Sequence, residues 1–286
     1  MSTLYQVLSN IPILVYIKKN VDRLEYSLYW VKKEFLVLVR KLNKDKLHYT
    51  AGSFTILCVK RPEYVNLAIR NINSLHFHNP AHKVQIYTDT VCAREFERTW
   101  GGIDYPANVR VVNKYRNTTQ PWQYLKIETL IAASKKNSVL IDADSIWYGD
   151  PQVSSSVITF LVAAYKLQDN SWEDKAVGKV FKSKKMKEYI HFVTGFVSIP
   201  SQFMTSRLEN QLRTSVRAFF SLDFSFIPDS KLADSLKRLA EEIVISYTVQ
   251  EMVPREKIMT LKNSDGPGNR QMIQSLYYGC SNTILE

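Results

Sequence analysis

Cysteine is scarce in this sequence. Its three cysteines, Cys58, Cys92 and Cys280, form an odd, widely spaced set without a C-x-x-C pair. That pattern excludes the framework of a disulfide-rich secreted domain. It is typical of reduced thiols, and it predicts a cytoplasmic protein.

A long uninterrupted apolar run is also missing. The most apolar stretch near the start, residues 4–17, is broken by polar residues and a proline: Gln6, Ser9, Asn10 and Pro12. It is too short to cross a bilayer, and it has neither the basic start nor the small-residue cleavage site of a secretory signal. We therefore expect neither a membrane span nor a signal peptide here.

Low-complexity segments, internal repeats and a clear linker are absent from the 286 residues. With 45% hydrophobic and 23% charged residues, the composition is that of an ordinary globular protein. This length predicts one elaborated α/β domain with a terminal extension.

Acidic residues are too few to balance the basic ones. The 38 lysines and arginines against 27 acids give a net charge of +11. Such a field favours anionic partners, which include nucleotide diphosphates, nucleic acids and acidic lipids. The aromatic and basic residues do not form a known nucleic-acid-binding module, so we expect no specific nucleic-acid partner.

The first fifty residues form a predicted extension, 1–50, ahead of a main domain, 51–286. Residues 22–46 carry apolar side chains at spacings of three and four on one face of a helix, with lysines and arginines on the others. One interpretation is a helix that packs on the main domain. The other is a basic amphipathic helix that contacts a membrane surface or a partner.

From residue 53 onward, short β-rich runs alternate with helical stretches. We expect strands at 54–59, 84–87, 109–112 and 139–141, and helices at 62–75, 93–100 and 122–134. This alternation predicts a mostly parallel, doubly wound α/β sheet. In such sheets ligands bind beyond the carboxyl ends of the strands.

Two acids, Asp142 and Asp144, directly follow the expected strand at 139–141. Carboxylates so close to an apolar core need a cation or strong hydrogen bonds. Mg²⁺ and Mn²⁺ prefer such oxygen ligands, often together with substrate phosphates. The alternative is an ordinary loop in which one aspartate caps a turn and the other is solvated.

The sequence around this pair resembles the GT-A glycosyltransferases, particularly bacterial-type and viral members. The resemblance is carried by the helix P-W-Q-Y-L-K-I-E-T-L at 121–130, with its W-x-x-x-K pattern, and by V-L-I-D-A-D at 139–144. It covers residues 54–149 best. It implies a GT-A fold and a metal-dependent transfer of sugar from a UDP- or GDP-linked donor to a glycan or other hydroxyl acceptor.

The resemblance also implies roles for individual residues. Asp142 would face the donor ribose or sugar, and Asp144, with Asp142 as a second candidate, would bind Mn²⁺ or Mg²⁺. Lys126, on the side of its helix that faces the sheet, would contact the donor; the alternative is that its ammonium reaches solvent.

The loops after the first two strands supply weaker donor candidates. Arg61 is a candidate for phosphate, Tyr64 for stacking on the base, and Asp89 for the base or ribose pocket. A plain surface-loop role is an alternative for each. Further on, Thr194 and Gly195 lie in an expected strand at 192–199, where glycine permits a ligand to come close; a simple β-bulge is the alternative.

Glu241 and Glu242 precede an apolar run and are the candidate catalytic acids. An inverting transferase needs a carboxylate to take the acceptor proton. Asp223 and Asp229 are competitors, and a solvated glutamate pair is the bland interpretation. Some GT-A families add a histidine near the C-terminus as a metal ligand, but the last histidine here is His191.

Other candidate features and functions stay open at this point. His76, His78 and His82 lack companions at zinc-site spacing, and the lysine-rich run at 175–187 is either a solvated surface or a lid over the diphosphate. A sugar nucleotidyltransferase is the enzymatic alternative, although the loop after the first strand has no glycine. A non-enzymatic basic protein that binds nucleic acid or membrane is the other.

Overall fold

A computed structural model describes residues 52–100, 107–147, 150–151, 155–166, 171–181, 189–260 and 273–275. The chain divides into two compact units, residues 1–49 and 50–286, and all described residues belong to the second. The helix predicted at 22–46 and the lysines at 182–187 lie outside the described residues.

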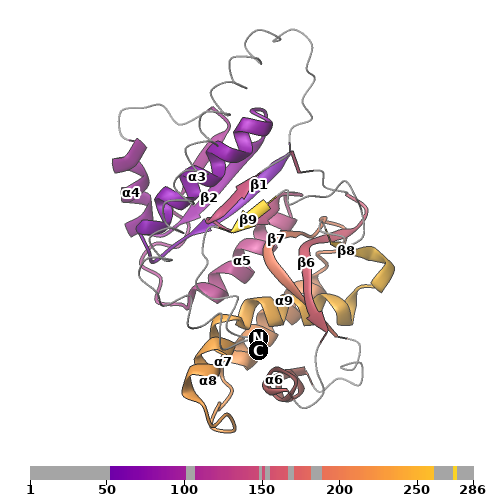
Figure 1. Cartoon of the computed structure of the whole chain (residues 1–286). Coiled ribbons are helices and arrows are strands. Elements are labelled where there is room, and N and C mark those ends of the chain that lie inside the picture. The colour runs from indigo at the N-terminus through magenta and orange to yellow at the C-terminus, as the bar shows by residue number, and fades with distance from the viewer. Residues whose placement is uncertain are drawn as a thin grey trace, which may run out of the picture. The chain divides into compact units, whose positions relative to one another are not determined.

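One mixed sheet of seven strands organises this unit, in the order β3-β2-β1-β4-β7-β6-β8 (Figure 1). Its strands are β1 (Ser53–Cys58), β2 (Lys83–Thr88), β3 (Val109–Val112), β4 (Val139–Ile141), β6 (Ile158–Lys166), β7 (Ile190–Ser198) and β8 (Ile258–Thr260). Only the two pairings made by β7, with β4 and with β6, are antiparallel. The predicted mostly parallel α/β sheet is thus confirmed.

Helices connect the parallel half of the sheet, as the sequence pattern predicts. They are α3 (Glu63–His78), α4 (Thr90–Trp100) and α5 (Trp122–Ser134). The predicted bounds of β3, β4 and α5 are the observed ones, and the other predicted elements differ by up to three residues at an end. A separate pair of short strands, β5 (Ser145–Trp147) and β9 (Ile273–Ser275), runs antiparallel.

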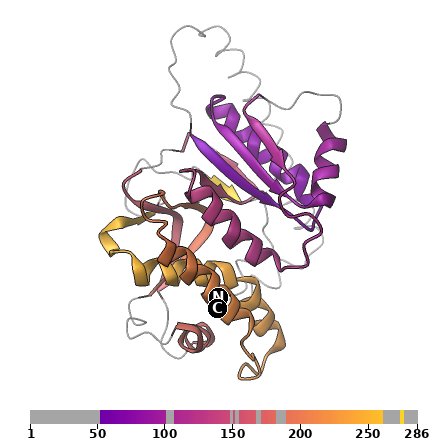
Figure 2. The ribbon, with the colours of Figure 1, turned by 180° about the vertical axis from the view of Figure 1, so that it is seen from behind.

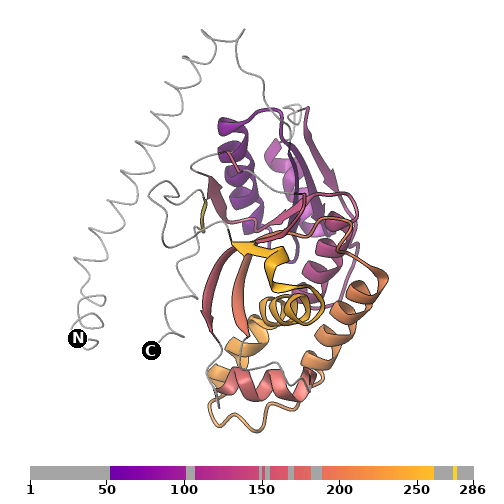
Figure 3. The same cartoon turned by 90° about the vertical axis from the view of Figure 1, so that its right-hand side faces the viewer.

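Two apolar cores lie on the two faces of the sheet. Because neighbouring side chains of a strand point to opposite faces, Phe54 and Ile56 of β1 pack with α3 and α4. On the other face, Leu140 of β4 and Val197 of β7 pack with α5, α7 (Ser206–Phe220) and α9 (Ala240–Met252). Figure 2 shows α5 from this side, and Figure 3 shows α9 between β7 and α7.

The remaining elements are peripheral to the sheet: α6 (Trp172–Phe181), α8 (Ser230–Arg238) and a 3₁₀ turn at Arg255–Lys257. Within the part of the chain that the structure describes, no helix combines the length and the apolar character that crossing a membrane requires.

Candidate active site

Lys126 is the centre of a buried ionic cluster. It lies on the side of α5 that faces the sheet, and its side chain is only 5% exposed. Its Nζ lies 2.8 Å from Oδ1 of Asp142 and 3.6 Å from Oε1 of Glu241. Burial lowers the pKa of Lys126, but the charges of Asp142, Glu241 and Glu242 outweigh it and raise that pKa above its ordinary value. A permanently charged ammonium therefore faces the end of β4, and the interpretation of Lys126 as solvent-reaching is wrong.

Asp142 is held by its backbone at the junction of three elements. Its N–H donates to the carbonyl oxygen of Gly195 on β7 (3.0 Å), and its own carbonyl accepts from Nδ2 of Asn71 on α3 (2.6 Å). The side-chain oxygen that Lys126 does not hold, Oδ2, faces Gly195, where a Cβ would come to 3.5 Å. The side chain of Asp142 is 36% exposed, so part of its carboxylate is accessible to a ligand.

Asn71 also fixes the segment beyond the two acids. Its Oδ1 accepts from the indole Nε1 of Trp147 (2.8 Å), and Oγ of Ser74, one turn along α3, accepts from the Trp147 backbone N–H (3.1 Å). Asn71 is fully buried. Residues 142–147 are therefore anchored to α3 on both sides of Asp144.

Glu242 is bound on both of its carboxylate oxygens. Oε2 lies 3.1 Å from Nε2 of His191, and Oε1 accepts from the backbone N–H and the hydroxyl of Thr194, both at 3.3 Å. Burial raises the pKa of Glu242, but the hydrogen bond and charge of His191 lower it more. Glu242 is therefore an anion fixed against β7, and the interpretation of it as a solvated surface residue is wrong.

Glu241 differs from its neighbour. Its side chain is 4% exposed, and its Oε2 has no hydrogen-bond partner within the described portion of the chain. Burial is the main cause that raises the pKa of Glu241 to about 8, with the charge of Lys126 opposing it. Glu241 thus titrates near neutral pH, and its Oε2 has no hydrogen-bond partner among the described residues.

His191 is the residue that sequence analysis missed as part of this cluster. The sequence singles out His191 only as the last histidine, in connection with metal ligands. In the structure it lies between Glu242 and Glu173, with Nδ1 2.9 Å from Oε1 of Glu173. Burial lowers its pKa, and the hydrogen bonds to Glu173 and Glu242 overcome this and raise it to about 10. No local sequence signal reveals this contact, because the three residues are far apart along the chain.

The stability of the protein should depend on this imidazolium. Since the pKa of His191 rises from 6.5 to about 10 on folding, its contribution is fully present below pH 6.5 and is lost as the pH rises through 10. We expect His191→Gln to lower the free energy of unfolding by about 3 kcal/mol at pH 6. The difference should shrink as the pH approaches 10. Urea unfolding of both proteins across this range tests it, and a pH-independent difference would contradict it.

The three other donor candidates lie at the same carboxyl edge of the sheet as Asp142. Asp89, directly after β2, accepts from the backbone N–H of Cys92 (2.9 Å) and of Lys60 (2.6 Å). It therefore caps the start of α4 and holds the loop after β1. The guanidinium of Arg61 lies 5.7 Å from the ring centre of Tyr64. The structure thus holds the loops after β1 and β2 next to each other at this edge of the sheet.

The competing acids have local structural roles. Asp229 accepts from the backbone N–H of Lys231 at the start of α8, and Asp223 binds the N–H and hydroxyl of Ser225. No contact found for the described residues links either one to the cluster around Lys126.

The donor set at Asp142 and Asp144 fits a hard divalent ion that is shared with a ligand. Among the described residues, no group of three or more histidines, cysteines or acids is placed to hold a metal. Two neighbouring carboxylates are what Mg²⁺ or Mn²⁺ uses when phosphates complete the shell. Lys126 occupies Oδ1 of Asp142, and Oδ2 of Asp142 faces Gly195.

The histidines of α3 do not form a zinc site. His76 contacts the carbonyl oxygen of His82 (2.9 Å), and His78 contacts that of Trp147 (3.1 Å). His82 binds Oδ1 of Asp150 (2.7 Å). His78 thus holds the last residue of β5 and His82 holds Asp150 beyond it, whereas His76 binds the backbone just before β2.

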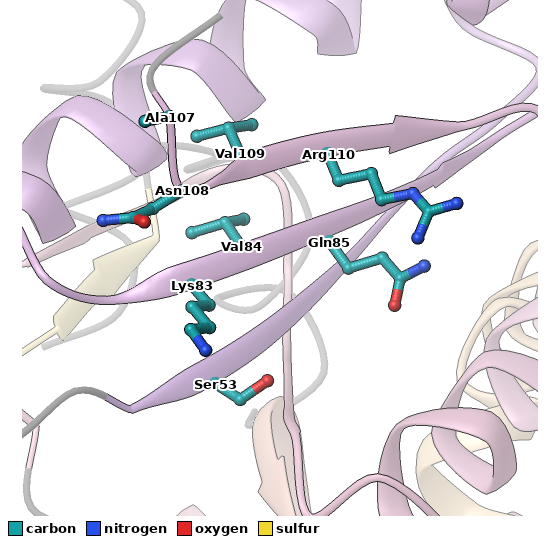
Figure 4. A pocket seen from close by; sticks show the side chains of 8 residues that line it. All are labelled: Ser53, Lys83, Val84, Gln85, Ala107, Asn108, Val109 and Arg110. Atoms are coloured by element: carbon teal, nitrogen blue, oxygen red, sulfur yellow. The ribbon is translucent and has the colours of Figure 1, made fainter.

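A cavity of about 290 Å³ lies away from the cluster (Figure 4). It is lined by Ser53, Lys83, Val84, Gln85, Ala107, Asn108, Val109 and Arg110. The first residues of β1, β2 and β3 are among them. The cavity therefore lies at the amino ends of these strands, whereas the acids follow the carboxyl end of β4.

Comparisons with known proteins return structural similarity alone. No protein-family model matches the chain, and no curated protein matches it. The chain is similar to the galactosyltransferase LgtC, solved with donor and acceptor sugar analogues (TM-score 0.43, 8% identity, covering 72% of this chain and 73% of that one). It is similar to the mannosyltransferase Ktr4p of S. cerevisiae (0.44, 10%, 79% and 78%). It is also similar to mouse xyloside xylosyltransferase 1 (0.42, 10%, 73% and 84%). All three are glycosyltransferases, the class that the sequence resembles.

Proposed function

We propose that the chain is a metal-dependent glycosyltransferase that moves a sugar from a nucleotide-diphosphate donor to an acceptor hydroxyl. One observation carries the proposal. Lys126, Asp142 and Glu241 come from three separate elements and meet at the carboxyl edge of a parallel sheet, where such sheets bind ligands. Burying a cluster of charged groups costs desolvation free energy, and such clusters with shifted pKa values concentrate at functional sites.

The cluster has the groups that donor binding requires. Asp144, with Asp142 as a second ligand, would hold Mn²⁺ or Mg²⁺, which when bound stabilises the charge of the departing diphosphate. Lys126 orients the Asp142 carboxylate through the 2.8 Å contact and adds fixed positive charge. The exposed part of the Asp142 carboxylate would then accept hydrogen bonds from hydroxyls of the donor.

Glu241 is the better candidate for the proton acceptor. Both oxygens of Glu242 are bound to His191 and Thr194, which leaves it to hold β7 against α9. Glu241 retains an oxygen without a partner among the described residues, and its pKa of about 8 lies near the operating pH, where general bases are most effective.

The remaining donor contacts are assigned by position. Arg61 and Tyr64 follow β1 and Asp89 follows β2, so the nucleotide of a UDP- or GDP-linked sugar would lie over these loops. Its sugar would point toward Asp142, and Thr194 and Gly195 would form the acceptor side. The cytoplasmic location and the membrane contact of the basic helix at 22–46 stay predictions.

Donor hydrolysis tests the proposal without knowledge of the acceptor. The purified chain is incubated with a panel of UDP- and GDP-hexoses, and release of the nucleoside diphosphate is measured. We expect turnover with Mn²⁺ or Mg²⁺, its loss in EDTA, and its return when the metal is restored. Full activity in EDTA would contradict metal dependence. Release of pyrophosphate from a sugar phosphate and a nucleoside triphosphate would instead indicate a nucleotidyltransferase.

A further inference from the structure

One large aromatic side chain is exposed near the cluster. In the portion of the chain that the structure describes, three large apolar residues are exposed: Val91 (55%), Met259 (42%) and Trp122 (38%). Trp122 alone among them is aromatic. Exposing an indole gives up the large gain in free energy that its burial provides, so its place in the fold calls for a reason.

The fold puts Trp122 beside the candidate active site. It is the first residue of α5, directly after Pro121, and α5 returns to the amino end of β4 through the bond from Ser138 N–H to the carbonyl of Ala133. The first turn of α5 therefore lies at the opposite edge of the sheet, the edge that carries Asp142. Trp122 precedes Lys126 by one helical turn, about 6 Å along the axis, and its ring centre lies 5.9 Å from Nζ of Lys126.

The neighbours of Trp122 on the same turn are committed to the fold, whereas Trp122 is not. Gln123 donates to the carbonyl of Lys237, and the ring of Tyr124 packs on that of Phe220 with centroids 5.3 Å apart. Within the described residues, the ammonium of Lys126 is the one charged or aromatic group that contacts the indole of Trp122. The indole thus forms part of the wall around the Lys126–Asp142 pair and keeps over a third of its surface open.

We propose that Trp122 is a stacking platform for a sugar ring at the mouth of this site. A pyranose has a face of C–H groups that packs on an aromatic surface, while its rim of hydroxyls needs polar partners such as the partly exposed carboxylate of Asp142. An exposed indole next to carboxylates offers both. A nucleobase also stacks on indole, but the residues assigned to the base follow β1 and β2, whereas Trp122 lies by the acids that follow β4. Naming the ligand as a sugar depends on the proposed function.

The ring belongs to either the donor sugar or the acceptor sugar, and kinetics separate the two. Trp122→Phe, Trp122→Ala and the control Met259→Ala, which removes another exposed apolar side chain, are compared with wild type. Donor hydrolysis gives the KM for the donor, and transfer to a panel of methyl hexosides gives the KM for the acceptor. We expect Trp122→Ala to raise one of these KM values about tenfold, Trp122→Phe to raise it less than threefold, and Met259→Ala to change neither.

Failure of this inference is distinguishable from failure of the proposed function. If wild type turns over donor and Trp122→Ala keeps both KM values within twofold, the platform is wrong and the transferase stands. If wild type shows no turnover, the same sugars are titrated against the tryptophan fluorescence of wild type and of Trp122→Phe. A saturable change that only wild type shows supports the platform, and the absence of a change overturns it. Thermal unfolding of each variant shows that a KM effect is not a folding defect.

Discussion

Asp144→Asn should reduce metal-dependent donor hydrolysis by two to three orders of magnitude and leave the fold intact. The reason lies in its position, since Asp144 is half-buried, three residues past the end of β4, in a segment that α3 anchors on both sides. Asparagine keeps the size of the side chain but removes the charge that an Mn²⁺ or Mg²⁺ ion needs from its ligand. Losing one electrostatic stabiliser of a departing group typically costs this much in rate.

The measurement pairs the rate with two independent readouts. Titration calorimetry of Mn²⁺ in the presence of a nucleoside diphosphate should show weaker binding in the variant. Its thermal midpoint should stay within about 2 °C of wild type, a shift that corresponds to no more than about 1 kcal/mol for a domain of this size. Asp234→Asn is the matched control, because Asp234 is an exposed acid on α8 that pairs with Lys237. A variant that keeps wild-type rate would remove Asp144 from the metal site.

Lys126→Met should be the most destabilising single change in the cluster. It removes the cation that lies between Asp142 and the buried Glu241, and it leaves acids without compensation at the end of β4. Breaking a buried pair in this way costs about 3–5 kcal/mol. The loss should be smaller at pH 5 than at pH 8, because burial already raises the pKa values of Asp142 and Glu241 and both can take up protons in acid.

A second substitution makes this prediction sharp. Adding Glu241→Gln to Lys126→Met removes the buried acid together with its cation, so the double variant should regain part of the lost free energy of unfolding, and a double-mutant cycle measures the coupling. Turnover should not return, since the candidate proton acceptor is gone, which by itself costs about a hundredfold. If Glu241→Gln changes the free energy of unfolding by the same amount in wild type and in Lys126→Met, the two residues are not coupled.

The parallel half of the sheet was predictable because its signals are local. Short apolar runs such as 109–112 and 139–141 alternate with helical stretches, and the predicted strand and helix bounds there lie within three residues of the observed ones. The position of Asp142 at a ligand-binding edge follows from that pattern alone. The antiparallel half was less accessible, since the pairing of β7 with both β4 and β6 depends on register between distant segments and not on any local period.

The same distinction holds for the candidate site. Lys126, Asp142, Glu241, Glu242, Thr194 and Gly195 were each named from the sequence, and the structure brings them into one connected group. The sequence could not show which glutamate has both carboxylate oxygens bound and which keeps one unpaired. The partner that decides this, His191, lies 51 residues from Glu242. Periodicity places a side chain on a face, but contact across the core selects its partner.

The anchoring of residues 142–147 by Asn71 has a consequence for how the site accommodates different ligands. The side-chain amide of Asn71 on α3 binds both the carbonyl of Asp142 and the indole of Trp147. Moving the acids therefore requires breaking both of these hydrogen bonds. The backbone that carries the two acids is therefore set in place when the protein folds and needs no reordering when a ligand binds. Adaptation to one sugar or another must then come from side chains outside this segment, such as Trp122 at the start of α5, whose substitution leaves both Asn71 bonds in place.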